Sequence, residues 1–488
     1  MTDKNHFDAI IVGSGAGGCA AAYTLARAGL CVALIEKGRE LPRDGSTLDF
    51  HRVVEQGSFK SREPWQDAGG RQFCPEEYFN VGGKTKWYGA ALLRYGRHEF
   101  SADPTHPCLG WPIGYDELVP FYEQAERMLG VRQFDCEPNL RHIAESLMHH
   151  SPSWNYEPLP MGLSARILYN PGEARHFDGF ASAAHLKSDA ETTFLAPVRA
   201  LPNLALLTDR VVAELVGSES DATLIEAVRL QDGSLLHGRV ILLAAGALHS
   251  PRLLQNYIET RGLTAILPCA DNVGRYLKCH LLTAMIAIST PRMTDLVRKT
   301  LIFYNADMSH SSVQPLGFDG ELISTLIPKF VPRTMAGLVG NHAYGFFLQT
   351  EDGAHRDNRV IAASQGHGGL PVYDYDARRT PVAEAEHHEL VSRFRGALAR
   401  AGLIAFAERI GIAGTAHVSG TLCTGTDPKA SVVDSEGLVH GMKSLYVVDG
   451  SILPRSSRVN PSLTIYAWAL RVASELAARL STGAVATA

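Results

Sequence analysis

The hydrophobic positions near the N-terminus predict a strand, a helix and a second strand in direct succession. Residues 7–12 form a short apolar run that is typical of a buried parallel strand. Residues 16–28 are rich in alanine and predict a helix, which ends at Gly29. Residues 31–35 are again apolar and predict the second strand. We therefore expect an N-terminal βαβ unit and an α/β fold.

A second group of strands is predicted near the middle of the chain. Short apolar runs at 205–207, 210–216 and 227–230 are followed by a turn signal at Asp232-Gly233 and a longer run at 240–247. This spacing predicts a β-meander inserted in the domain that the N-terminal unit begins.

Residues 291–411 predict a different architecture. Strand-like segments such as 322–327 and 344–348 alternate with polar loops, which favours an antiparallel sheet in an α+β domain. Helical patterns cover 119–129 and 382–400.

The chain length sets the number of domains. At 488 residues, and roughly 150 residues per domain, we expect two or three. We assign residues 1–100, 195–290 and 412–488 to a discontinuous nucleotide-binding domain, and residues 101–194 and 291–411 to a substrate-binding domain.

The turn between the first strand and the first helix carries a glycine motif. Gly13, Gly15 and Gly18 have the spacing G-x-G-x-x-G, and the acidic residue Glu36 ends the second strand. In a dinucleotide site the first glycine permits a tight turn, the second admits a pyrophosphate, and the third lets helix and strand pack closely. Glu36 would bind the ribose hydroxyls. The same motif also occurs at other turns, but the surrounding strands and helix favour a Rossmann-like domain.

Two further stretches of small residues can approach a flat ligand. Gly82 and Gly83 allow backbone to pass where a Cβ would collide, although a plain hairpin turn would explain them equally well. The strand at 240–247 ends in small residues, which fits either a second cofactor contact or a packed strand-to-helix junction.

Composition and charge exclude several function classes. The chain is 45% hydrophobic and 20% charged with a mean hydropathy of -0.04, as in ordinary globular enzymes. No apolar run reaches the roughly 18 residues of a membrane span, and no leader peptide is visible, so we expect a cytoplasmic protein. A net charge of -5 argues against a nucleic-acid surface. The eight cysteines lack C-x-x-C or metal-ligand spacing, so no metal is expected.

Candidate chemistry gathers in the last 75 residues. His417 could be a catalytic base, since the pKa of histidine lies near neutral pH, or a core histidine bonded to backbone. Asn460, followed by Pro461, could cap the C-terminal helix or bind substrate.

These motifs together resemble the glucose-methanol-choline (GMC) oxidoreductase family, flavoproteins that oxidise alcohols to carbonyls. The resemblance covers residues 13–36, 81–90, 244–254, 272–280 and 414 to the C-terminal helix, and it is loose in between. Residues 110–118 and 370–375 are most similar to the pyranose oxidase and sugar dehydrogenase branches. The resemblance implies that FAD is the cofactor and that His417 is the base. It also implies that Asn460 fixes the substrate oxygen while hydride leaves for flavin N5.

The resemblance also implies which residues hold FAD. Its ADP half would lie on Gly13, Gly15, Gly18 and Glu36, its adenine between Val212 and Ala245, and its flavin along Gly82, Gly83, Thr85 and Tyr88, with Asp449, Gly450 and Pro461 at the pyrimidine side. Trp87 stands where several sugar-oxidising relatives attach FAD through a histidine. We therefore expect noncovalent FAD.

The substrate is expected to be a sugar, glycoside or aminocyclitol. A sterol or an aliphatic alcohol is the alternative substrate. The alternative function is that of a noncatalytic flavin electron-relay subunit. The electron acceptor, either oxygen or a soluble carrier, and the oligomeric state are left open by the sequence.

Overall fold

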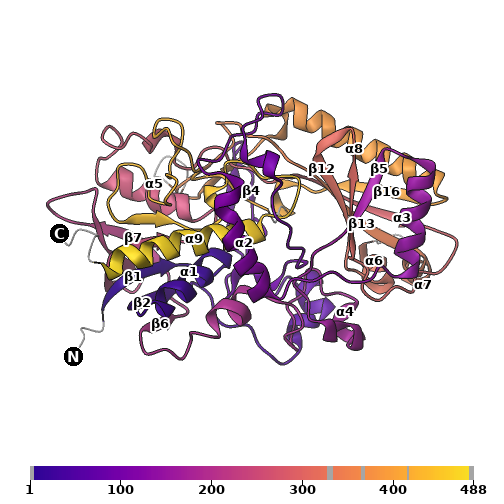
Figure 1. The fold of residues 1–488 in the computed structure, drawn as a ribbon, viewed down its shortest axis with the longest axis horizontal. Helices are drawn as coiled ribbons and strands as arrows, with labels where there is room; N and C mark the ends of the chain where they lie inside the picture. Colours follow the sequence, from indigo (N-terminus) through magenta and orange to yellow (C-terminus); the bar gives the residue numbers. More distant parts are fainter. Residues whose placement is uncertain (1–4, 327–332, 364–368, 415–416, 483–488) are drawn as a thin grey trace.

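The computed structural model describes residues 5–326, 333–363, 369–414 and 417–482. Figure 1 shows two regions side by side. One contains a mainly parallel sheet with the N-terminal βαβ unit, and the other contains an antiparallel sheet covered by helices.

The first region is built on a seven-stranded sheet. Its strands are β1 (His6–Val12), β2 (Val32–Ile35), β6 (Leu204–Leu207), β7 (Val212–Gly217), β8 (Ile225–Leu230), β9 (Leu235–Leu243) and β17 (Leu445–Val447). β6, β2, β1, β9 and β17 pair in parallel, whereas β7, β8 and β9 form an antiparallel meander. The expected Rossmann-like sheet with an inserted meander is confirmed.

Strand β9 belongs to both parts of this sheet. Its first residues pair with β8 of the meander, and its last residues pair with β1 and β17. Residues 240–243 are completely buried, as expected for a strand covered on both faces.

Helices α1 (Ala16–Arg27) and α9 (Ser462–Ser481) pack against each other on this sheet (Figure 1). Alanines of α1 face the long apolar side of α9, so the two backbones can lie close together. Helix α2 (Tyr115–Leu129) packs on α9, and α5 (Ser250–Thr260) packs on β7.

The second region is a six-stranded antiparallel sheet in the order β16-β10-β13-β12-β11-β5. The strands are β5 (Trp154–Pro158), β10 (Leu281–Ile288), β11 (Leu301–Asn305), β12 (Met308–Pro315), β13 (Ala343–Thr350) and β16 (Ile404–Arg409). Helices α3 (Pro138–His150) and α8 (Pro381–Arg400) cover one face (Figure 1). The antiparallel sheet is as expected, while the exact domain boundaries remain a prediction.

One expected strand is wrong. Residues 320–326 form helix α6 (Gly320–Leu326), which packs on α7 (Arg333–Asn341) and on β13. Residue 327 lies outside the described residues. A short apolar run does not distinguish a strand from a helix, and contacts with α7 decide between them here.

The chain also forms a small four-stranded sheet. It contains β14 (Arg359–Ile361), β15 (Val372–Asp374), β3 (Trp65–Asp67) and β4 (Gln72–Phe73). Its strand β14 contacts α5. The short helix α4 (Pro171–Ala174) lies in the long connection between β5 and β6.

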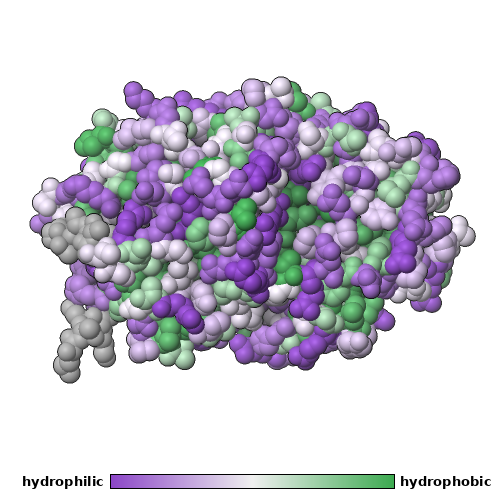
Figure 2. Space-filling view, in the orientation of Figure 1, coloured by the Kyte–Doolittle hydropathy of each residue, from purple (hydrophilic) through white to green (hydrophobic). Residues whose placement is uncertain are grey.

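The face shown in Figure 2 is largely hydrophilic, with hydrophobic side chains in small patches. Among the described residues, none of the helices has both the length and the apolar content that crossing a membrane requires.

Candidate active site

A cavity of about 1090 Å³ lies between the two regions. Its wall contains the glycine turn after β1, the ends of β2 and β9, the segment before α9, and one face of the antiparallel sheet. The predicted site residues that line it are Gly13, Gly15, Glu36, Gly83, Thr85, Tyr88, Val212, Ala245, His417, Asp449, Gly450, Asn460 and Pro461. Gly18 and Gly82 stand behind this wall.

The three glycines of the first turn have different surroundings. Gly13 has φ +106°, and a Cβ there would lie 2.4 Å from the Ala244 carbonyl oxygen. A Cβ on Gly18 would lie 1.9 Å from the carbonyl oxygen of Gly13. A Cβ on Gly15 would meet no protein atom within 4 Å. The fold thus requires Gly13 and Gly18, whereas Gly15 leaves open space in front of the α1 N-terminus.

Ser14 joins the two glycine motifs. Its hydroxyl donates to Glu36 Oε2 over 2.6 Å and accepts from the backbone N–H of Gly82 over 3.2 Å. Glu36 also accepts from the backbone N–H of Gly38. Burial raises the pKa of Glu36 above its usual value, and these hydrogen bonds oppose that shift.

The segment with the second glycine pair closes the cavity floor. Thr85 donates to the Gly82 carbonyl over 2.6 Å, and the Tyr88 hydroxyl donates to the Ser188 carbonyl over 2.6 Å. A Cβ on Gly83 would lie 3.2 Å from the Cα of Gly15, so the two motifs meet backbone to backbone.

Asp449 holds the far end of the same wall. Its carboxylate accepts hydrogen bonds from the backbone N–H groups of Gly246 and Ser451 and from the hydroxyls of Ser250 and Ser451. It therefore connects the end of β9, the start of α5 and the segment before α9.

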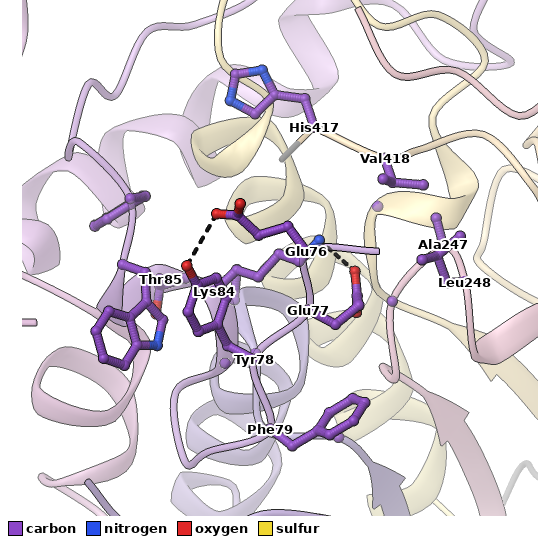
Figure 3. Close-up of a pocket in the computed structure, with 18 of the residues that line it drawn as sticks. Glu76, Glu77, Tyr78, Phe79, Lys84, Thr85, Ala247, Leu248, His417 and Val418 are labelled. Atoms are coloured by element: carbon purple, nitrogen blue, oxygen red, sulfur yellow. Dashed lines mark hydrogen bonds and ion pairs between the residues drawn. The ribbon is translucent and has the colours of Figure 1, made fainter. Parts of the chain in front are cut away.

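His417 projects into the cavity from the segment before Val418. Figure 3 shows it across the cavity from Tyr78, with Glu76 and Lys84 between them. Its Nδ1 lies 3.1 Å from Nδ1 of His280. Burial, and then the nearby His280, Lys299 and Lys84, lower the pKa of His417 well below its usual value, which favours the neutral imidazole.

Asn460 is not the cap of the C-terminal helix, contrary to the capping interpretation. Pro461 occupies the cap position, and no side chain caps α9. Asn460 Oδ1 instead accepts from Gln314 Nε2 over 2.6 Å, and its Nδ2 lies 3.5 Å from Nε2 of His417. The structure therefore brings the two candidate catalytic side chains together.

The cavity also contains residues, both polar and apolar, that sequence reasoning missed. Gln314 on β12, Phe347 on β13 and Ala284 on β10 are cross-strand neighbours and all face the cavity. Lys299 and Asp178 form an ion pair of 2.7 Å beside them. No motif in the sequence marks these positions; only the pairing of the strands reveals them.

Comparison with known proteins gives the same picture at both ends of the chain. Residues 354–469 match the family described as GMC oxidoreductase, and residues 8–153 match FAD dependent oxidoreductase. The chain is therefore similar to GMC oxidoreductases in its C-terminal part and to FAD-dependent oxidoreductases in its N-terminal part. The N-terminal match indicates FAD as the cofactor.

Individual relatives match almost all of the chain. It is 28% identical to paromamine 6'-oxidase of Streptomyces fradiae, over 98% of this chain and 92% of that protein. It is 23% identical to 2-methyl-1,2-propanediol dehydrogenase of Mycolicibacterium austroafricanum, over 98% and 97% of the two chains. The crystal structure of pyridoxine 4-oxidase from Mesorbium loti shares the fold, with a TM-score of 0.67, 18% identity, and coverage of 96% and 98%.

The residues that line the cavity fit FAD. The open space at Gly15 lies at a helix N-terminus, whose free N–H groups suit a pyrophosphate. Small residues along Gly83 and Ala245 leave room for flat rings. The indole of Trp87 donates to Asn80 Oδ1 over 3.0 Å and stacks on Tyr78, so this side chain offers no group for covalent attachment.

Gly15→Ala should separate cofactor binding from folding. The new Cβ meets no protein atom within 4 Å, so the free energy of unfolding of the FAD-free variant should lie within about 1 kcal/mol of that of the wild type. FAD affinity should fall roughly tenfold or more, because the methyl group would overpack the ligand. Flavin-fluorescence titration measures this, with Gly396→Ala in α8 as the matched control. Unchanged affinity would contradict a pyrophosphate at Gly15.

Proposed function

We propose that this protein oxidises an alcohol group of a sugar, glycoside or aminocyclitol to a carbonyl, with His417 as the base. The observation that carries the proposal is the approach of His417 Nε2 and Asn460 Nδ2 to 3.5 Å at one point of the cavity wall. Bound FAD would supply the flavin N5 that accepts a hydride from the substrate carbon.

The polarity of the two side chains suits a hydroxyl group. Gln314 donates to Oδ1 of Asn460, so the amide N–H₂ of Asn460 is turned toward His417. A substrate oxygen between them could accept from Asn460 and give its proton to a neutral His417. Catalytic hydrogen bonds are often long in ligand-free structures and shorten when substrate binds, which is consistent with the 3.5 Å separation.

The polar groups in the cavity favour a polyhydroxylated or amino-substituted substrate. Asp178 and Lys299 keep only 13% and 7% of their side chains exposed, and Gln314 lies on the neighbouring sheet. Such groups lose hydration when an apolar ligand covers them, whereas hydroxyl and amino groups replace the lost water. Similarity to an oxidase named for paromamine supports this class.

An aliphatic alcohol is the second candidate. Similarity to a diol dehydrogenase favours it, and so do Leu316, Phe318 and Phe347 in the cavity wall. Oxygen or a soluble carrier would reoxidise the flavin in either case.

The substrate class and the base can be tested together. Anaerobic mixing of the yellow protein with aminoglycosides, neutral sugars, sterols and aliphatic diols should bleach flavin absorbance with the first two classes. In His417→Ala the bleaching rate should fall about 10²–10⁴-fold while FAD stays bound, because the general base is lost. His388→Ala, an exposed histidine on α8, is the control. Bleaching by sterols or aliphatic diols alone would contradict the sugar class.

The ion pair of the cavity should affect amino-substituted substrates most. In Asp178→Asn we expect KM for an aminated sugar to rise about tenfold, since a charge-assisted hydrogen bond contributes about 1.5–3 kcal/mol. KM for the neutral analogue should change less. Asp116→Asn, in an exposed ion pair with Arg97, serves as the control. An equal rise in KM for both substrates would argue against recognition of the amine by Asp178.

Noncovalent FAD is a separate prediction. Acid precipitation should release all of the flavin into the supernatant, because Trp87 has no nucleophilic group and is already bonded to Asn80. Absorbance of the two fractions measures the outcome. Flavin retained in the washed pellet would show covalent attachment elsewhere.

A further inference from the structure

We propose that His280 is a positioning residue that fixes the tautomer of His417 and thereby leaves Nε2 of His417 free to act as the base. This inference rests on the proposed role of His417. It assigns a function to a side chain that lies outside the cavity wall.

The donor and acceptor pattern permits one arrangement for neutral rings. His280 Nε2 lies 2.7 Å from the carbonyl oxygen of Ser457, which can only accept, so His280 Nε2 carries the proton. Nδ1 of His280 then has a lone pair. His417 Nδ1, 3.1 Å away, must donate to it. The proton of His417 is therefore on Nδ1, and Nε2 is unprotonated.

The opposite end of the site has a matching polarity. Gln314 donates to Asn460 Oδ1, so Asn460 Nδ2 presents N–H toward His417 Nε2. A nitrogen with a lone pair suits that contact, whereas a protonated Nε2 would face another donor. Two independent anchors, the Ser457 carbonyl and the Gln314 amide, thus agree on the same tautomer.

The backbone holds His280 and His417 side by side. Lys278 and Ser419 exchange two backbone hydrogen bonds of 2.9 Å, which form a short antiparallel bridge between the two segments. The rings meet edge to face, with centroids 5.1 Å apart. The side-chain contact is therefore set by backbone pairing rather than by two flexible loops.

His280 and its hydrogen-bond partner Ser457 both have unusual backbone conformations. His280 has φ +59° and Ser457 has φ +69°, in the left-handed region that non-glycine residues rarely adopt. Ser457 is held there by its N–H to Glu351 and its hydroxyl to Glu99. Such conformations persist only where surrounding contacts impose them, and they gather at functional sites. Here they aim the Ser457 carbonyl at His280.

The group that accepts from Nδ1 of His417 is an imidazole nitrogen and not a carboxylate. A carboxylate in the place of His280 would stabilise the imidazolium of His417 and raise its basicity, whereas an imidazole nitrogen orients the ring without adding a negative charge. Lys299 and Lys84 also face His417 and oppose its protonation. The pair therefore keeps a weak base in one tautomer.

The tautomer can be measured without substrate. In ¹⁵N-histidine-labelled holoprotein, NMR should show His417 with Nδ1 protonated and Nε2 unprotonated, with the signal assigned by its absence in His417→Ala. In His280→Leu the signal should move toward the Nε2-protonated form. A wild-type signal of the Nε2-protonated form would overturn the proposal, whether or not any variant folds.

Kinetics provide the second readout. His280→Leu should lower the rate of flavin reduction by roughly 100-fold with KM changed less than about threefold, because general-base catalysis is lost while binding is kept. His280→Gln, whose amide can donate to Ser457 and accept from His417, should recover the rate to within about tenfold of wild type. Equal rates in the two variants would overturn the positioning role. If the tautomer is as expected but no alcohol reduces the flavin, the proposed function fails and the tautomer assignment stands.

Discussion

The carboxylate of Glu351 is the constraint on which the geometry of the cavity depends. It is fully buried, it accepts two hydrogen bonds from Arg455, and it accepts one each from the Ser457 backbone N–H and from His310. Burial alone would raise the pKa of Glu351, but the bonds from His310 and Arg455 hold it below its usual value. Removing one partner of such a buried pair costs about 3–5 kcal/mol. Because the Ser457 carbonyl accepts from His280, a substitution at Glu351 would alter the position of His280 and, through it, the orientation of His417.

The antiparallel sheet holds two of the next three residues of this segment, Arg458 and Asn460. Ser312 and Gln349 both donate to the carbonyl oxygen of Arg458 over 2.6 Å, and Gln314 donates to Asn460. Side chains two apart on a strand face the same side, so β12 and β13 present a row of donors to one loop. The sheet of one region thus positions a catalytic candidate that the other region carries.

Much of the first region could be predicted from sequence, because the glycine turn and the apolar strands depend on local rules. Gly13 and Gly18 are required by close backbone contacts, and such contacts leave a spacing that can be recognised. Helix α6 was predicted wrongly, since its apolar run fits either structure until α7 packs on it. The hydrogen bond between Gln314 and Asn460 could not be predicted, because the two residues are 146 positions apart in the sequence. His280 lay within a recognised stretch, but its role depends on a partner at position 417 that only the fold brings near.

The order of strands in the parallel sheet affects how the chain can fold during synthesis. The N-terminal βαβ unit acquires its neighbour β9 only when residue 243 has been made, and β17 and α9 follow some 200 residues later. Until then α1 lacks α9, the helix with which it makes its most extensive contact. Long-range pairing of this kind slows folding and exposes apolar surface in the meantime. A nascent chain would therefore expose apolar surface of α1 until α9 has been made, and loss of α9 should make the start of the chain prone to aggregation.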